Sequence, residues 1–224
     1  MELTVVAASG GTGRHILDQA VAAGHDVTAV VRNPRKLDGL GNRVRIVAVD
    51  LASPDAGALR EAVAGAGAVL SALGATSAHE EGVAERGTRA VVAAMRTAGA
   101  HRLVVLSAAP IGTVPSPQRP TPPRHDPGDG FFMRHLGVPF ARTKFRAHYA
   151  DLARMEDVVR GSDLDWSISR PPMFTDKPGT GRYREAFGRN IRGGFSIPRA
   201  DVAHHMLGLV DRPETVRQII GVAS

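Results

Sequence analysis

A cluster of glycines and one arginine near the N-terminus have residue types and spacing that suit phosphate binding. Gly10, Gly11 and Gly13 follow the apolar run Leu3–Ala7, and Arg32 follows a second apolar run. Glycines that open a helix let backbone N–H groups approach a pyrophosphate at the positive end of the helix dipole. A guanidinium after the second strand suits a 2′-phosphate, whereas an acid there would bind a ribose 2′-hydroxyl. The pattern therefore predicts a dinucleotide site for NADP(H).

The glycines must be positioned by a strand–turn–helix–strand unit. Leu3–Ala7 and Val27–Val31 are short apolar runs typical of buried strands, and Gly24 is placed to end the helix between them. The alternative is an ordinary turn whose glycines serve packing and whose arginine is solvated. One departure is visible, because Ala7 stands where the first glycine of such a turn is usual.

Three further polar residues belong to the same turn. We expect Ser9 and Thr12 to cap the helix as well as to contact phosphate. Arg14 lies one step into the helix, where it is a candidate second cation for a 2′-phosphate.

Strand and helix patterns continue to alternate along the chain. Further strands are predicted at 44–49, 68–73, 103–107, 165–169 and 216–222, and further helices at 58–64, 80–98, 142–159 and 201–210. Such alternation predicts an α/β fold, a doubly wound Rossmann-type parallel sheet with helices on both faces. The length suits a single domain over residues 1–224.

In a sheet of this kind the ligand crevice lies at the carboxyl ends of the strands. The residues expected there are Asp50, Leu51, Leu73, Gly74, Ser107 and Ala108. Asp50 suits an adenine amino group, and Gly74 allows close approach of backbone. Ser107 is the candidate catalytic residue, as a hydrogen-bond partner of a substrate or of the nicotinamide carboxamide. The alternative is that its hydroxyl only satisfies backbone hydrogen-bonding groups at the end of the strand. Pro171 and Pro172 would form a rigid wall beside the nicotinamide.

A proline-rich loop follows the fifth strand. Residues 110–130 hold seven of the fifteen prolines and few apolar side chains. We expect residues 110–140 to form a mobile flap over the nicotinamide end of the crevice, with plain disorder as the alternative. The next helix, 142–159, is expected to turn four apolar side chains inward, namely Phe145, Leu152, Met155 and Val159.

Many reductases with this fold carry Tyr-x-x-x-Lys on that helix, where lysine lowers the tyrosine pKa. In one register the pair falls on Phe140 and Lys144, and in the other on His148 and Leu152. Tyr149 is one step off and would point elsewhere. The sequence thus predicts that the dyad is missing. A flavin or quinone acceptor is consistent with this, since it takes its proton from water.

Composition argues against other classes. The net charge is +6, but the arginines are scattered and aromatic residues make up only 4%. We therefore expect a basic surface that serves an anionic cofactor, with no nucleic-acid or membrane partner. Asp201 and His205, one helical turn apart, are a poor metal site, and the chain has no cysteine. We expect no metal, a cytoplasmic location, and a monomer or small homo-oligomer.

The chain resembles the atypical short-chain dehydrogenase/reductases, in particular the group with biliverdin-IXβ reductase (flavin reductase) and the NmrA-like NAD(P)-binding proteins. The resemblance covers essentially the whole chain. It rests on AASGGTG at 7–13, VVRNPRKL at 30–37, LSA at 106–108, DLARMEDVVRGSDLDWSISRPPMFTDKPGTGRY at 151–183 and IPRADVAHHML at 197–207.

This resemblance implies NADPH binding, with contacts from Gly10, Thr12, Gly13, Arg14, Arg32, Asp50, Leu51, Leu73, Gly74, Ser107 and Pro171. In the reductase branch a histidine directly follows the Pro-Pro pair, and here that residue is Met173. The leading hypothesis is an NADPH-dependent reductase of a flat conjugated acceptor, of flavin or quinone type. The alternative is a regulatory protein that binds NADP(H) and senses redox state without turnover. A third hypothesis is an epimerase or isomerase, against which the missing tyrosine counts.

Overall fold

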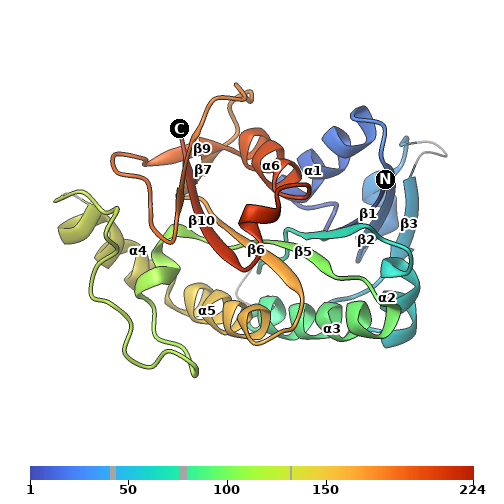
Figure 1. Cartoon of the computed structure of the whole chain (residues 1–224), viewed down its shortest axis with the longest axis horizontal. Helices are drawn as coiled ribbons and strands as arrows, with labels where there is room; N and C mark the ends of the chain where they lie inside the picture. The colour runs from blue at the N-terminus through green and yellow to red at the C-terminus, as the bar shows by residue number, and fades with distance from the viewer. Residues whose placement is uncertain (41–43, 76–79, 132) are drawn as a thin grey trace.

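A mostly parallel sheet of eight strands runs through the molecule (Figure 1). The computed structural model describes residues 1–40, 44–75, 80–131 and 133–224. The strands are β1 (Glu2–Val6), β2 (Asp26–Val31), β3 (Val44–Ala48), β4 (Ala68–Ser71), β5 (Arg102–Leu106), β6 (Asp165–Arg170), β8 (Arg184–Phe187) and β10 (Gln218–Ala223). Their order is β3-β2-β1-β4-β5-β6-β10-β8. Only β8 pairs antiparallel among these strands, at the β10 edge of the sheet.

Helices cover both faces of the sheet, which confirms the predicted doubly wound Rossmann-type architecture. On one face lie α1 (Gly11–Ala22) and α6 (Arg199–Gly208), and on the other α2 (Ala56–Val63), α3 (Val83–Ala98) and α5 (Arg146–Arg160) (Figure 1). No helix among the described residues is long and apolar enough to cross a membrane. A separate two-stranded pair, β7 (Met173–Thr175) with β9 (Ser196–Pro198), was not predicted, nor was β8.

Alternation of side chains along the buried strands gives each face its own core. In β1, Leu3 and Val5 pack in the cluster that contains Ile16 and Leu17 of α1. Val6 packs instead in the cluster that contains the apolar side chains of α2, α3 and α5. Because successive strand residues point to opposite faces, a strand buried on both sides needs apolar residues at nearly every position.

The predicted helix over 142–159 is broken in the structure. A short helix, α4 (Val138–Lys144), comes first. Phe145 follows it, and α5 begins directly after Phe145. Phe145 has φ −112° and ψ 28°, outside the helical region, so it leaves the periodicity of α5. Its placement on the inner face was therefore wrong, because its side chain is 44% exposed. The other three predicted inner residues, Leu152, Met155 and Val159, are buried.

The proline-rich segment packs along α5 and its neighbours, and it begins with the short helix η4 (Ala109–Thr113). The Ser116 hydroxyl and the Gln118 backbone N–H both donate to the carboxylate of Asp157. Asp126 is buried and accepts hydrogen bonds from the backbone of Gly128 and Asn190. The role of residues 110–140 as a flap stays a prediction, and Phe132 lies outside the described residues.

A buried ion pair joins α5 to the end of β6. Glu156 and Arg170 are 1% and 5% exposed, and the Arg170 guanidinium donates to both oxygens of the Glu156 carboxylate. Ser107, directly after β5, donates its hydroxyl to Glu156 over 2.6 Å. Burial disfavours the charge on Arg170, but Glu156 outweighs it and raises the pKa of the guanidinium. Three elements are thus held together at the carboxyl edge of the sheet.

Loss of one partner should leave an uncompensated charge in the core. Arg170→Met is expected to lower the free energy of unfolding by about 3–5 kcal/mol, measured by urea denaturation. Glu156→Leu combined with Arg170→Met should recover most of that loss, because neither charge then remains.

The matched control is Arg96→Met, which removes an exposed partner of Asp163. Its unfolding midpoint should stay close to that of the parent protein. Equal destabilisation by the two single variants would contradict a special role for the buried pair.

Candidate functional site

The glycine turn is built around the carbonyl of Ala7. Gly10 donates its backbone N–H to this oxygen over 3.0 Å. A β-carbon on Gly13 would lie 2.2 Å from the same oxygen, so only glycine fits there without moving backbone. Ala7 itself has φ +60°, a left-handed conformation that glycine adopts far more readily. The chain therefore keeps the shape of the turn although it lacks the first glycine.

The first turn of α1 leaves its backbone donors available. Gly10 is the N-cap residue, and no side chain in the described part of the chain caps this end. The expectation that Ser9 and Thr12 cap the helix is thus wrong. The reason is that Gly10, which precedes α1, lacks a side chain, and Thr12 lies inside the helix. Arg14 pairs with Asp18 one turn along α1, over 2.8 Å.

A cleft of about 250 Å³ crosses the carboxyl ends of the neighbouring strands β1, β2, β3 and β4. Seven predicted site residues line it, namely Ser9, Gly10, Arg32, Asp50, Leu51, Leu73 and Gly74. The other lining residues are Ala7, Val30, Val31, Asn33, Lys36, Val49, Glu80 and Val83. The strand order reverses between β1 and β4, which is where ligands bind in open α/β sheets.

Arg32 already has a partner in this cleft. Its Nη1 lies 2.7 Å from Oε1 of Glu80, and the side chains of the two residues are 60% and 17% exposed. The hydrogen bond and the charge of Glu80 raise the pKa of Arg32, and Asp50 adds to the effect. Lys36 lines the same cleft. One end of the cleft therefore holds two cations beside two carboxylates, and the sequence analysis named neither Glu80 nor Lys36.

Asp50 and Leu51 differ in exposure. Asp50 is exposed, and its carboxylate accepts the backbone N–H of Ala52 over 3.0 Å, which fixes the turn after β3. Leu51 is buried and packs with Leu73 in the core under the cleft. Gly87 of α3 lies against both leucines, because a β-carbon there would be 2.5 Å from the Leu73 side chain.

The predicted residues Ser107, Ala108 and Pro171 lie at the next strand ends and do not line this cleft. Ser107 is 3% exposed, and its hydroxyl donates to Glu156. Its backbone N–H donates to Ser169, and the N–H of Ala109 donates to Pro171 over 2.9 Å. These bonds tie the end of β5 to the end of β6. The roles assigned to the three residues stay predictions.

Arg199 at the start of α6 lies across the glycine turn. A β-carbon on Gly11 would be 3.2 Å from Cδ of Arg199 and 3.3 Å from its Nε. Asp176 holds this guanidinium at 2.9 Å, and the ring of Phe174 lies 4.7 Å beneath it. The sequence analysis missed this cation, since no local pattern connects residue 199 with residue 11.

The residues at the two registers considered for a Tyr-x-x-x-Lys pair lie in different places. Lys144 places its Nζ over the rings of Phe140 and Phe145, on the exposed helix α4. His148, in the first turn of α5, lies against the cleft, because a β-carbon on Gly74 would be 3.6 Å from its Cε1. Burial lowers the pKa of His148, and the charge of Asp151 opposes this only in part. Burial thus favours the neutral form of the imidazole.

Asp201 and the histidines of α6 have other partners. Asp201 is buried and accepts the backbone N–H groups of Thr180 and Gly181. His204 pairs through Nδ1 with the Tyr183 hydroxyl at 2.8 Å. The ring of His205 points inward, and burial lowers its pKa to about 4. No group of three His, Cys, Asp or Glu side chains among the described residues could hold a metal ion.

A doubly wound sheet with a glycine turn between β1 and α1, and a cleft across the adjacent strand ends, defines a Rossmann-type dinucleotide-binding protein. Residues 7–213 match the NAD(P)H-binding family, so the chain belongs to that family. This confirms the resemblance to NAD(P)H-binding proteins.

The chain is also similar to individual proteins over its whole length. It is 28% identical to the uncharacterised protein YwnB of Bacillus subtilis, over all of this chain and 99% of that one. Its fold matches ChuY of Escherichia coli O157:H7, named an anaerobillin reductase, with a TM-score of 0.77 and 23% identity over 100% and 97% of the two chains. It also matches a short-chain dehydrogenase/reductase of Veillonella parvula, solved with NADP, with a TM-score of 0.74 and 16% identity over 100% and 94%.

The contact between Gly13 and Ala7 leads to a test of the turn. Gly13→Ala should remove measurable dinucleotide binding and lower the melting temperature, because the new methyl group collides with a backbone oxygen. Ala7→Gly should raise the free energy of unfolding by roughly 1 kcal/mol, since it relieves a left-handed alanine.

Gly208→Ala is the matched control, because nothing lies within 4 Å of a β-carbon at that position in α6. It should leave dinucleotide binding unchanged. If Gly13→Ala binds as well as Gly208→Ala, the described turn is not the binding element. Binding is measured by calorimetry and melting by circular dichroism.

Proposed function

We propose that this protein is an NADPH-dependent oxidoreductase that reduces a flat conjugated acceptor of flavin or quinone type. The observation that carries the proposal is the cleft at the β1–β4 reversal, where Ser9 and Gly10 of the glycine turn and Arg32 line one groove. Membership of the NAD(P)H-binding family supports the same cofactor class. When bound, a reduced nicotinamide dinucleotide supplies a hydride.

The residues of the cleft fit a dinucleotide. The backbone N–H groups at the start of α1 suit a pyrophosphate, and Arg199 adds a guanidinium beside that turn. At the adenosine end, Asp50 offers a carboxylate to an adenine amino group, and Val30 and Leu51 offer apolar contact. The NADP in the Veillonella parvula structure is consistent with this assignment.

The preference for NADP(H) depends on whether the 2′-phosphate of the cofactor replaces the Glu80 carboxylate as the partner of Arg32. Arg32 is largely exposed and pairs with Glu80, so a 2′-phosphate can take the place of this carboxylate. Lys36 lines the same end of the cleft and supplies a second cation. Glu80 opposes the phosphate by like-charge repulsion and offers an acceptor to a ribose 2′-hydroxyl. The opposing effects of Arg32 and Glu80 thus determine the ratio of the affinities for NADPH and NADH.

The acceptor class follows from the proton donors near the strand ends. The Ser107 hydroxyl donates to a buried carboxylate, and burial lowers the pKa of His148. Neither group is placed to supply a proton readily at neutral pH. A flavin or quinone that has taken up a hydride is protonated by water, so it needs room to stack more than it needs an acid.

The same observations favour a second candidate, a protein that binds NADP(H) and signals redox state without turnover. Ser107 is the predicted catalytic residue, yet it is 3% exposed and its hydroxyl is already used. Such a protein would bind oxidised and reduced dinucleotide without consuming either.

The two candidates are separated by turnover. Oxidation of NADPH, followed by its absorbance, should accelerate with at least one member of a panel of free flavins and quinones. Gly208→Ala should retain this rate, and Gly13→Ala should lose it. Tight binding of both NADP⁺ and NADPH, with no oxidation above that of Gly13→Ala, would favour the sensor and refute the reductase.

The cofactor preference is tested by two substitutions in the pair of Arg32 and Glu80 that should change the NADPH affinity in opposite directions. Arg32→Glu should weaken NADPH about 10- to 100-fold, since a charge-assisted hydrogen bond is worth about 1.5–3 kcal/mol, and should change NADH little. Glu80→Gln should tighten NADPH several-fold, because it frees Arg32 and removes a negative charge.

The charge-matched control is Arg60→Glu on the exposed surface of α2. Dissociation constants for NADPH and NADH are measured for all four proteins. Parallel changes in both cofactors for Arg32→Glu would mean that Arg32 does not contact the 2′-phosphate.

A further inference from the structure

We infer that the described residues of the segment 131–146, which are Phe131 and residues 133–146, form a docking surface for an anionic lipid bilayer. This segment contains the five-residue helical turn η5 (Met133–Gly137) and α4, and ends at the first residue of α5. Figure 1 shows it at one extreme of the molecule, away from the cluster of β1, β2 and β3. The proposal departs from the composition-based expectation of no membrane partner, and it is independent of the proposed reductase activity.

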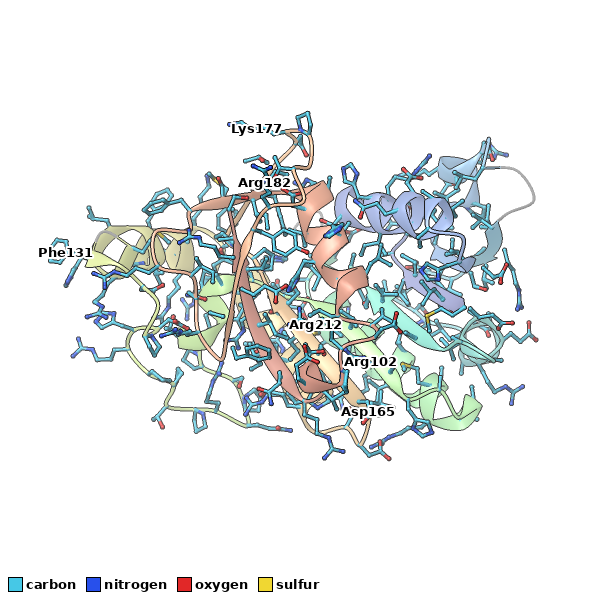
Figure 2. All side chains as sticks on the ribbon, turned by 45° about the horizontal axis from the view of Figure 1, so that its top comes forward. Arg102, Phe131, Asp165, Lys177, Arg182 and Arg212 are labelled. Atoms are coloured by element: carbon cyan, nitrogen blue, oxygen red, sulfur yellow. The ribbon has the colours of Figure 1, made fainter. Side chains whose placement is uncertain are left out.

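The first observation is a local concentration of exposed apolar side chains. Four of the seven phenylalanines of the chain fall between residues 131 and 145. Phe131, Leu136 and Phe140 are 81%, 61% and 68% exposed, and Phe145 is 44% exposed. Figure 2 shows Phe131 projecting outward at the edge of the molecule. Val138 is 5% exposed and anchors α4.

The second observation is the charge of the same segment. Between Asp129 and Asp151 the sequence holds four cations and no acid. The cations are Arg134, Arg142, Lys144 and Arg146. None of them forms an ion pair within the described residues, whereas many arginines elsewhere pair with acids, among them those at positions 14, 32, 89, 96, 154 and 212. Positive charge here is uncompensated.

The cations and the apolar groups are interleaved. The Nζ of Lys144 lies 5.9 Å from the ring centre of Phe140 and 5.5 Å from that of Phe145. The ring of His135 lies 4.5 Å from that of Phe131. The surface of an anionic bilayer suits both kinds of side chain. Its headgroup phosphates attract the cations, and the aromatic rings insert at the boundary between headgroups and acyl chains.

Charge complementarity favours an anionic bilayer over a second copy of the chain, and the shape of the surface disfavours a nucleic acid. A second copy of the chain would bring four unpaired cations against four more, so self-association through this face is disfavoured. A nucleic acid would meet the same charge. However, the most exposed ring, Phe131, stands at a projecting edge rather than in a groove that tracks a strand (Figure 2).

The test is co-sedimentation of the full chain with vesicles. Phosphatidylcholine mixed with phosphatidylglycerol should bind the protein, more weakly at high salt, and phosphatidylcholine alone should not. Arg142→Glu with Lys144→Glu should weaken binding more than about tenfold. Phe131→Ser with Phe140→Ser should abolish it.

Matched controls come from exposed residues outside the segment. Lys177→Glu with Arg182→Glu makes the same charge change on a distant loop (Figure 2), and Phe187→Ser removes an exposed phenylalanine of β8. Both controls should bind vesicles like the parent. Every variant should keep the parent's circular dichroism spectrum, because the altered residues lie outside both hydrophobic core clusters.

A fluorescence readout reports insertion directly. The one tryptophan of the chain, Trp166, is 7% exposed, so it gives a nearly constant background. Phe140→Trp should show a blue shift with the anionic vesicles and none with phosphatidylcholine alone.

Three results would overturn the proposal. The first is no binding to anionic vesicles at low salt. The second is equal loss of binding in the Lys177/Arg182 control. The third is a partner of another class: a dimer that Phe131→Ser with Phe140→Ser dissociates, or an oligonucleotide retained by the segment while vesicles are not.

Discussion

The buried pair of Glu156 and Arg170 is the interaction on which the second half of the molecule depends. Two charges with almost no solvent contact are tolerable only when each completes the hydrogen bonds of the other. The pair therefore fixes α5 relative to β6, and the Ser107 hydroxyl adds the end of β5 to the same carboxylate. Because Pro171 follows Arg170 directly, this pair helps to position the two prolines, together with the hydrogen bond from the Ala109 N–H to Pro171.

Different interactions therefore stabilise the cleft and the strand ends beyond it. The cleft is shaped by backbone, through the close approach of Gly13 to the Ala7 carbonyl. In its ion pair between Arg32 and Glu80, the arginine side chain is 60% exposed. An exposed pair is weak and is exchanged readily for a ligand phosphate. The pair of Glu156 and Arg170 is shielded from solvent and cannot be exchanged in this way. One set of charges is thus suited to binding and the other to support.

The sequence predicts well those features that are local. The glycine turn, Arg32 and the strand ends at Asp50, Leu73 and Gly74 lie within short patterns whose spacing sets their place. The cleft is lined by Ser9 and Gly10 of the turn, by Arg32 and by these strand ends. Glu80 and Arg199 escaped prediction because no periodicity marks them. Glu80 reaches the cleft, and Arg199 reaches the glycine turn, from distant segments of the chain. Phe145 was misplaced for the opposite reason: a helical pattern was extended through a residue whose backbone leaves the helix. The antiparallel strand β8 has no alternating apolar pattern to reveal it.

The supporting pair also limits the chemistry that the proposed site could perform. A serine at the end of β5 would be a natural proton donor, but its hydroxyl is directed to Glu156, and release of it would leave a buried carboxylate short of a hydrogen bond. His148 is the other polar group beside Gly74, and burial lowers its pKa. Stability at the strand ends and acid catalysis thus compete for the same serine. The fold resolves this competition in favour of stability, in line with the proposed acceptor, which needs no proton from the protein.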